Sequence, residues 1–271
     1  MTPLKIGAAL CIEAIPAHRD WLYDADRDLE IQDFVFYDTY RNGWKDTVDR
    51  ARAATDGFRG RLGIHGPFIG LAIDNPDPDV REIIARRYVS AVEAAAALGA
   101  RQMVIHSPFD LWTHHHKLTG DGRQRGIFEA VHTLLRPALE LAEAQGVLLV
   151  VENCRDVVPS DRRDMIEAIG SSALAVSIDT GHAQLARDTY GAPPVDFFVR
   201  DAGDLLKHVH LQDLDGYADR HWAPGEGRVP WIELFRALGE LDSAPHLVLE
   251  LRRHEDIPKG FAHLQSLGIA I

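Results

Sequence analysis

Short apolar runs alternate with longer amphipathic stretches along the whole chain. Two of these stretches, 80–100 and 126–146, have the apolar spacing of helices, and a glycine stands at or near the end of each. Pro137 inside the second stretch predicts a kink or a break there. The short runs have the length of buried strands and lie at 4–10, 31–36, 61–65, 102–106, 147–152, 174–179, 207–211 and 246–250. This rhythm over about 250 residues predicts an α/β fold, a (β/α)8 TIM barrel, as a single domain over residues 1–271.

A doubly wound open sheet is the competing fold, but no G-x-G-x-x-G follows the first strand. No Pro/Gly/Ser-rich linker suggests a domain boundary. No apolar run is long enough for a membrane span, so no membrane partner is expected. The first apolar run contains Glu13 and reads as a strand rather than a signal peptide. Two cysteines in the chain fit a reducing, cytoplasmic location. A net charge of −12 makes nucleic acid an unlikely partner.

Six of the predicted strands share one polar pattern. Side chains alternate between the two faces of a strand, so Glu152 lies on one face with Leu148 and Val150, opposite a purely apolar face. The other strands repeat this arrangement, with an acid or histidine at or near the end. In a barrel these residues would ring the C-terminal mouth, where barrel enzymes build their sites: His65, His106, Glu152, Asp179, His210 and Glu250. Clustered carboxylates repel one another unless a cation neutralises them, and imidazole with carboxylate suits Zn, Mn, Fe or Co. The pattern predicts a metal site.

The stretch DGYADRHWAPGEG, residues 215–227, follows the seventh strand and has neither helical nor strand periodicity. We expect a loop over the same mouth, with Asp219 and His221 as further ligands. Gly225 and Gly227 would allow the tight turns that bring them inward. His182 lies about one helical turn beyond Asp179 and belongs with them.

Several segments resemble the xylose-isomerase-like superfamily of barrels, which includes sugar isomerases and epimerases and the endonuclease IV type of nuclease. The resemblance covers nearly the whole chain and rests on IHGPF (64–68), VIHSPF (104–109), VVEN (150–153), SIDTGHAQL (177–185), HVHLQD (208–213), DRHWAPGEGRVPW (219–231) and LVLEL (247–251).

Among epimerases and isomerases of ketoses, the resemblance implies one divalent metal held by Glu152, Asp179, His210 and Glu250. It also implies that Glu152 and Glu250 are the catalytic pair, removing and returning a proton next to a substrate carbonyl. The metal would stabilise the enediolate that forms. His182 would contact a substrate hydroxyl.

The nuclease-type members imply a different use of the same mouth. They hold three zinc ions, and every matching position here carries a suitable residue: His65, His106, Glu152, Asp179, His182, His210, Asp219, His221 and Glu250. Metal-assisted phosphoester hydrolysis therefore stays open, as does a metal-dependent lyase.

We predict a metal-dependent isomerase or epimerase acting on a small sugar, sugar acid or cyclitol, with one divalent ion (Zn, Mn, Co or Mg) and up to three. The alternatives are the zinc phosphoesterase or lyase, and a catalytically inactive barrel that only binds a sugar or metal. The presence of both Glu152 and Glu250 argues against the last, because a binder needs no acid–base pair. Family analogy suggests a homo-oligomer. Further expected substrate contacts are Phe68, Trp112, Arg220 and Trp222.

Overall fold

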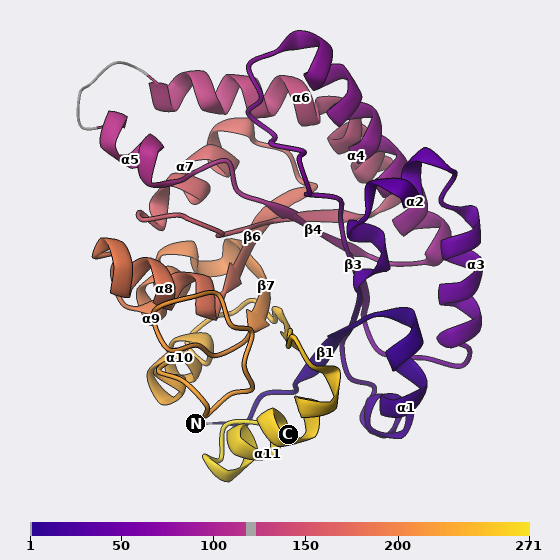
Figure 1. The fold of residues 1–271 in the computed structure, drawn as a ribbon, viewed down its shortest axis with the longest axis vertical. Helices are drawn as coiled ribbons and strands as arrows, with labels where there is room; N and C mark the ends of the chain where they lie inside the picture. The colour runs from indigo at the N-terminus through magenta and orange to yellow at the C-terminus, as the bar shows by residue number, and fades with distance from the viewer. Residues whose placement is uncertain (1, 118–122) are drawn as a thin grey trace.

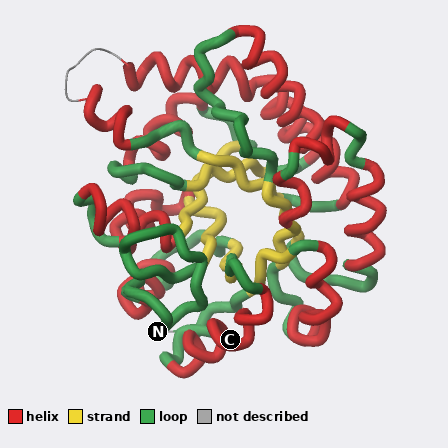
Figure 2. The backbone as a smooth tube through the Cα atoms, in the orientation of Figure 1, coloured by secondary structure: helices red, strands yellow, loops and turns green. Residues whose placement is uncertain are grey.

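A computed structural model describes residues 2–117 and 123–271 (Figure 1). Within them, eight parallel strands close into a barrel in chain order, with the last pairing to the first (Figure 2). The strands are β1 Gly7–Leu10, β2 Leu29–Ile31, β3 Leu62–His65, β4 Gln102–His106, β5 Leu148–Glu152, β6 Leu174–Asp179, β7 Leu206–Leu211 and β8 His246–Leu249. The predicted TIM barrel is confirmed, and an open doubly wound sheet is excluded.

Helices surround the barrel (Figure 2). Short 3-10 helices accompany them: η1 Ile12–Ala14, η2 Gln32–Val35, η3 Gly203–Leu205 and η4 His254–Asp256. In the described parts of the chain, none of the helices has the length and apolar content needed to cross a bilayer. The helices are α1 Ile15–Asp24, α2 Tyr37–Arg41, α3 Lys45–Ala54, α4 Pro78–Leu98, α5 Leu111–Lys117, α6 Arg123–Gln145, α7 Ser160–Ile169, α8 Thr180–Tyr190, α9 Val195–Ala202, α10 Trp231–Leu238 and α11 Ile257–Ser266.

The two long helices end where the sequence predicts. Gly99 caps α4 with a φ of 86°, and Gly146 follows α6 with a φ of 66°, a conformation that glycine adopts without a steric penalty. Pro137 does not break α6, which is one helix through that position. The proline lies on the exposed face, and helix hydrogen bonds on the solvent side are the ones that lengthen most readily.

The two faces of the barrel wall differ as the strand alternation predicts. Residues of the apolar faces, such as Leu149 and Ile178, belong to the large buried cluster that joins the strands to the helices. The opposite faces point into the barrel, where Val104, Val150 and Ala175 form a separate small cluster. The helices thus cover the outer face of the barrel wall, and its inner face can carry polar side chains.

Seven predicted strands overlap their observed counterparts closely, although β1 begins later than predicted. The prediction for the second strand is wrong. The sequence predicts a strand over 31–36, whereas β2 ends at Ile31 and η2 follows. The Asp33 side chain accepts a hydrogen bond from the Ile12 amide at 2.7 Å. Phe34 is fully buried. The hydrogen bond to Asp33 and the burial of Phe34 together hold the chain in a turn rather than an extended strand. The shift moves Glu30 into the strand.

Candidate metal centre

The six strand-end residues lie at one mouth of the barrel, as predicted. His65, His106, Glu152 and Asp179 are the last residues of β3 to β6, His210 is the last but one of β7, and Glu250 directly follows β8. All except His106 are buried. Burying this many ionisable groups together is costly unless they are paired or neutralised.

The centre of this group is His210. Its Nδ1 lies 3.3 Å from Glu152 Oε2 and 3.4 Å from Glu250 Oε2. Ligand atoms of Glu152, Asp179 and His210 lie within 4.8 Å of one another. Among the described residues, Glu152 Oε2, Asp179 Oδ2 and His210 Nδ1 are buried atoms without a hydrogen-bond partner. Such atoms are rare in folded proteins and indicate an unseen ion or water, so these residues fit a divalent metal.

Two further groups flank this one. Glu152 Oε2 also lies 3.7 Å from His65 Nε2 and 3.9 Å from His106 Nε2. On the other side, Asp219 Oδ1 lies 3.4 Å from His182 Nε2 and 3.2 Å from His221 Nε2. Both sets have the spacing of a metal site. All nine residues that the sequence predicts as ligands therefore gather at one place.

The charges in the cluster stabilise one another. Burial raises the pKa of Glu152, but the charge on His210 and the other nearby imidazoles outweigh it and hold that pKa well below its usual range. Burial lowers the pKa of His210, but Glu250, Glu30 and Glu152 raise it well above its ordinary value. For Asp179 burial dominates and raises the pKa.

The sequence profile of the family described as xylose isomerase-like TIM barrel matches residues 26–267. The chain belongs to this family. The resemblance noted in the sequence is confirmed, and it extends over most of the barrel.

Several of the relatives are named as sugar epimerases. The chain is 26% identical to a D-psicose 3-epimerase from Ruminiclostridium cellulolyticum over 192 residues, which cover 69% of this chain and 61% of that enzyme. A D-tagatose 3-epimerase-like protein of known structure shares the fold with a TM-score of 0.77 at 22% identity, covering 97% of this chain and 96% of that one. A Thermus thermophilus protein soaked with ZnCl2 superposes with a TM-score of 0.73 at 25% identity, covering 97% and 98% of the two chains.

Two side-chain amides that the sequence analysis did not select hold two of the predicted acidic ligands in place. The Asn153 side chain accepts from the Asp179 amide at 2.8 Å and donates to its carbonyl at 3.1 Å. Gln212 Nε2 donates to Asp179 Oδ1 and to Asp219 Oδ1, each at 3.1 Å. Gln212 thereby links two of the candidate metal groups. Asn153 lies within the motif VVEN and Gln212 within HVHLQD, and that position is the signal that would have found them.

The loop 215–227 is organised by Asp213, which is fully buried. Its carboxylate accepts from the Gly225 amide at 2.9 Å and the Trp231 indole at 3.1 Å. A side chain at Gly227 would lie 2.2 Å from the Leu214 carbonyl oxygen, so only glycine fits. His221 has a φ of 50°, uncommon for a residue other than glycine, and its Nδ1 lies 3.1 Å from the Glu250 carbonyl oxygen. The expected tight turns thus place His221 at the mouth of the barrel.

A pocket of about 1300 Å³ opens beside the centre, with His106, His182 and Asp219 in its wall. Phe68 also lines it and stacks on His106 with ring centroids 3.9 Å apart, and Trp112 lines it with 65% of its surface exposed. The other two expected contacts lie differently. Among the described residues, Arg220 pairs with Asp215 at 2.9 Å and covers the Trp222 ring, and neither Arg220 nor Trp222 lines the pocket. Their contact with substrate stays a prediction.

Proposed function

We propose that the chain is a divalent-metal-dependent epimerase or isomerase of a sugar, sugar acid or cyclitol. The observation that carries the proposal is the convergence of three buried, unpartnered atoms, Glu152 Oε2, Asp179 Oδ2 and His210 Nδ1, within the described residues. Glu250 Oε2 stands beside the same imidazole at 3.4 Å. The family and the epimerases named among the relatives support the same class of reaction.

Two carboxylates and one cation suffice for proton transfer next to a carbonyl. A bound divalent ion would supply positive charge that stabilises the charge developing on the substrate oxygen. One of Glu152 and Glu250 takes the proton, and the C–H electron pair moves toward the carbonyl carbon while the carbonyl pair moves to oxygen. The other glutamate returns a proton to carbon. Gln32 Nε2 donates to Glu250 Oε1 at 2.7 Å and orients that carboxylate.

The pocket beside the centre suits a sugar-like substrate. Phe68 and Trp112 present aromatic faces that can pack against the C–H face of a sugar ring, while His182 stands at the wall to contact a hydroxyl. The net charge of −12 disfavours a polyanionic substrate.

A second candidate is the multinuclear zinc phosphoesterase. One observation favours it: the flanking groups His65–His106–Glu152 and His182–Asp219–His221 also have metal-site spacing. Several ions there would activate a water and balance the leaving oxygen of a phosphoester.

Exchange in deuterated water separates the candidates. Metal-loaded protein is incubated with a panel of ketoses, keto sugar acids and keto cyclitols, and deuterium at the carbon next to the carbonyl is followed by NMR. Glu152→Gln and Glu250→Gln are each expected to abolish incorporation while the protein stays folded. Glu82→Gln, an exposed site on α4 paired with Arg86, is the matched control and should keep full exchange.

The metal content is measured on the same samples. One tightly bound ion per chain with exchange supports the epimerase. Three zinc ions, no exchange with any member of the panel and cleavage of a phosphodiester would refute it in favour of the hydrolase. Full exchange in both glutamine variants would remove the acid–base assignment.

A further inference from the structure

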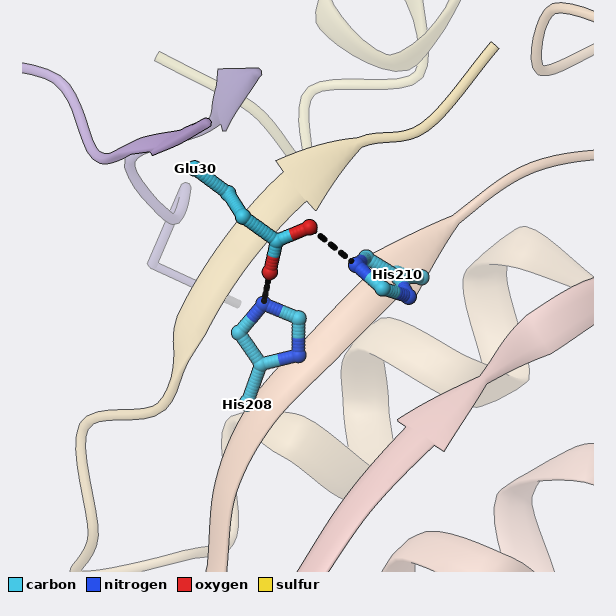
Figure 3. A group of neighbouring side chains, drawn as sticks. All are labelled: Glu30, His208 and His210. Atoms are coloured by element: carbon cyan, nitrogen blue, oxygen red, sulfur yellow. Dashed lines mark hydrogen bonds and ion pairs between the residues drawn. The ribbon is translucent and has the colours of Figure 1, made fainter. Parts of the chain in front are cut away.

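Glu30 is a buried carboxylate beneath the candidate centre that the sequence analysis did not select. It lies on β2, is 2% exposed and points into the barrel between two histidines of β7 (Figure 3). Its Oε1 lies 2.9 Å from His210 Nε2, and its Oε2 lies 3.1 Å from His208 Nε2. Each carboxylate oxygen thus faces one imidazole nitrogen.

The contacts of the three groups fix the orientation of both rings. A carboxylate oxygen accepts hydrogen bonds, so His210 Nε2–H donates to Glu30 Oε1. His208 is held from its other side, because its Nδ1 lies 2.9 Å from Ser177 Oγ. The His208 Nε2 faces the second oxygen of Glu30 at ion-pair distance.

The consequence for His210 is a fixed ring orientation. With Nε2 turned to Glu30, its Nδ1 is the atom that faces Glu152 and Glu250, and that nitrogen is buried without a hydrogen-bond partner in the described residues. A metal-ligating imidazole needs a free lone pair on one nitrogen and a partner on the other, which a carboxylate commonly provides.

We propose that Glu30 is a positioning residue that holds His210 with Nδ1 open toward the metal, itself oriented by His208 and Ser177. The inference rests on the proposed function insofar as His210 is a metal ligand. Glu30 touches neither the substrate nor the ion, and it acts through the ring of His210.

A competing use of the same atoms is a second ion between Glu30, His208 and His210, which have the spacing of a metal site. The geometry favours hydrogen bonds. His210 Nε2 and Glu30 Oε1 are already at hydrogen-bond distance, and an ion held there would have to displace the Nε2 proton that makes this contact. The two arrangements differ in metal count.

Glu30→Gln tests the proposal, because the amide keeps the shape but presents an N–H to one of the histidines. Asp28→Asn is the matched control. Asp28 lies two residues earlier, immediately before β2, is fully buried, and pairs with Arg61 rather than with His210. Both variants remove one buried negative charge. Glu30→Asp restores the carboxylate on a shorter side chain.

The first measurement is affinity for Co²⁺ by competition with a chelator, together with the visible spectrum of the bound ion. Glu30→Gln is expected to weaken binding about 10- to 100-fold and to change the spectrum. Asp28→Asn should bind within about twofold of the wild type, and Glu30→Asp should recover part of the loss. Wild-type affinity and spectrum in Glu30→Gln overturn the proposal, as does an equal loss in Asp28→Asn. Loss of a second ion from Glu30→Gln favours the competing site and also overturns it.

The second measurement needs no metal. In the metal-free protein, the proton on His210 Nε2 should give a far-downfield, slowly exchanging resonance that shifts or disappears in Glu30→Gln and stays in Asp28→Asn. If the wild type binds no divalent ion but shows this behaviour, the proposed function fails and the positioning role of Glu30 stands. A resonance unchanged in Glu30→Gln overturns the positioning role.

Discussion

Gly181 occupies the most confined position in the candidate centre, and Gly181→Ala is expected to disrupt it from outside the ligand set. Gly181 lies in the first turn of α8, two residues after Asp179. A Cβ there would lie 2.2 Å from Gln212 Cδ and Nε2 and 2.3 Å from Oε1. Gln212 is fully buried and bridges Asp179 and Asp219, so its amide has no free space to yield without breaking those bonds.

The size of the effect follows from these contacts. Overpacking a filled interior costs about 1–3 kcal/mol, and each hydrogen bond to a charged group contributes about 1.5–3 kcal/mol. Since Asp179 keeps its bond from the His182 amide, the loss is partial, and we expect the free energy of unfolding to fall by about 2–4 kcal/mol. Gly126→Ala in α6 is the control. Among the described atoms none lies within 4 Å of a Cβ there, and the helix should gain about 0.5–1 kcal/mol.

Chemical denaturation measures both variants, and a double-mutant cycle with Gln212→Ala isolates the clash. In the Gln212→Ala background the alanine at 181 has nothing to displace, so its cost should vanish. An unchanged cost in that background, or wild-type stability of Gly181→Ala alone, would refute the reasoning.

Two other variants probe the surroundings of the centre. His221→Asn, chosen because asparagine tolerates a positive φ, should retain the tight ion of a one-metal enzyme; elemental analysis showing loss of an ion would instead indicate a multinuclear site. Burial lowers the pKa of His246 to about 3, below the value of about 6.5 expected in the unfolded chain, so unfolding takes up a proton between these values. The stability from the neutral ring is complete above about pH 6.5 and is lost as the pH falls toward 3, so His246→Gln should flatten this decline by up to about 1.4 kcal/mol per pH unit in denaturation curves; an unchanged slope would contradict it.

The barrel and the gathering of its polar residues could be predicted because strand alternation is a local property. The parity that puts Glu152 and Asp179 on inner faces follows from spacing alone, and the closure of the barrel brings strand ends together. The loop ligands Asp219 and His221 were predictable because the loop follows an assigned strand.

Glu30 was missed because the second strand was predicted to begin after it. The apolar run IQDFVF outweighs the shorter alternation DLEIQ, in which Asp28, Glu30 and Gln32 share one parity. Applying the rule of the other six strands to this segment would have placed Glu30 inside the barrel. The turn that displaces the strand depends on Asp33 contacting Ile12, a pairing 21 residues apart that no local pattern reveals.

Glu152 lies close to four of the histidines at the mouth of the barrel. One of its oxygens is near His65, His106 and His210, and the other lies 3.2 Å from His182 Nδ1. Ions loaded into neighbouring positions would therefore draw on the same carboxylate, and filling one would alter the affinity of the next. The metal sites at this mouth would therefore not fill independently, so a metal titration should be fitted with a model of interacting sites.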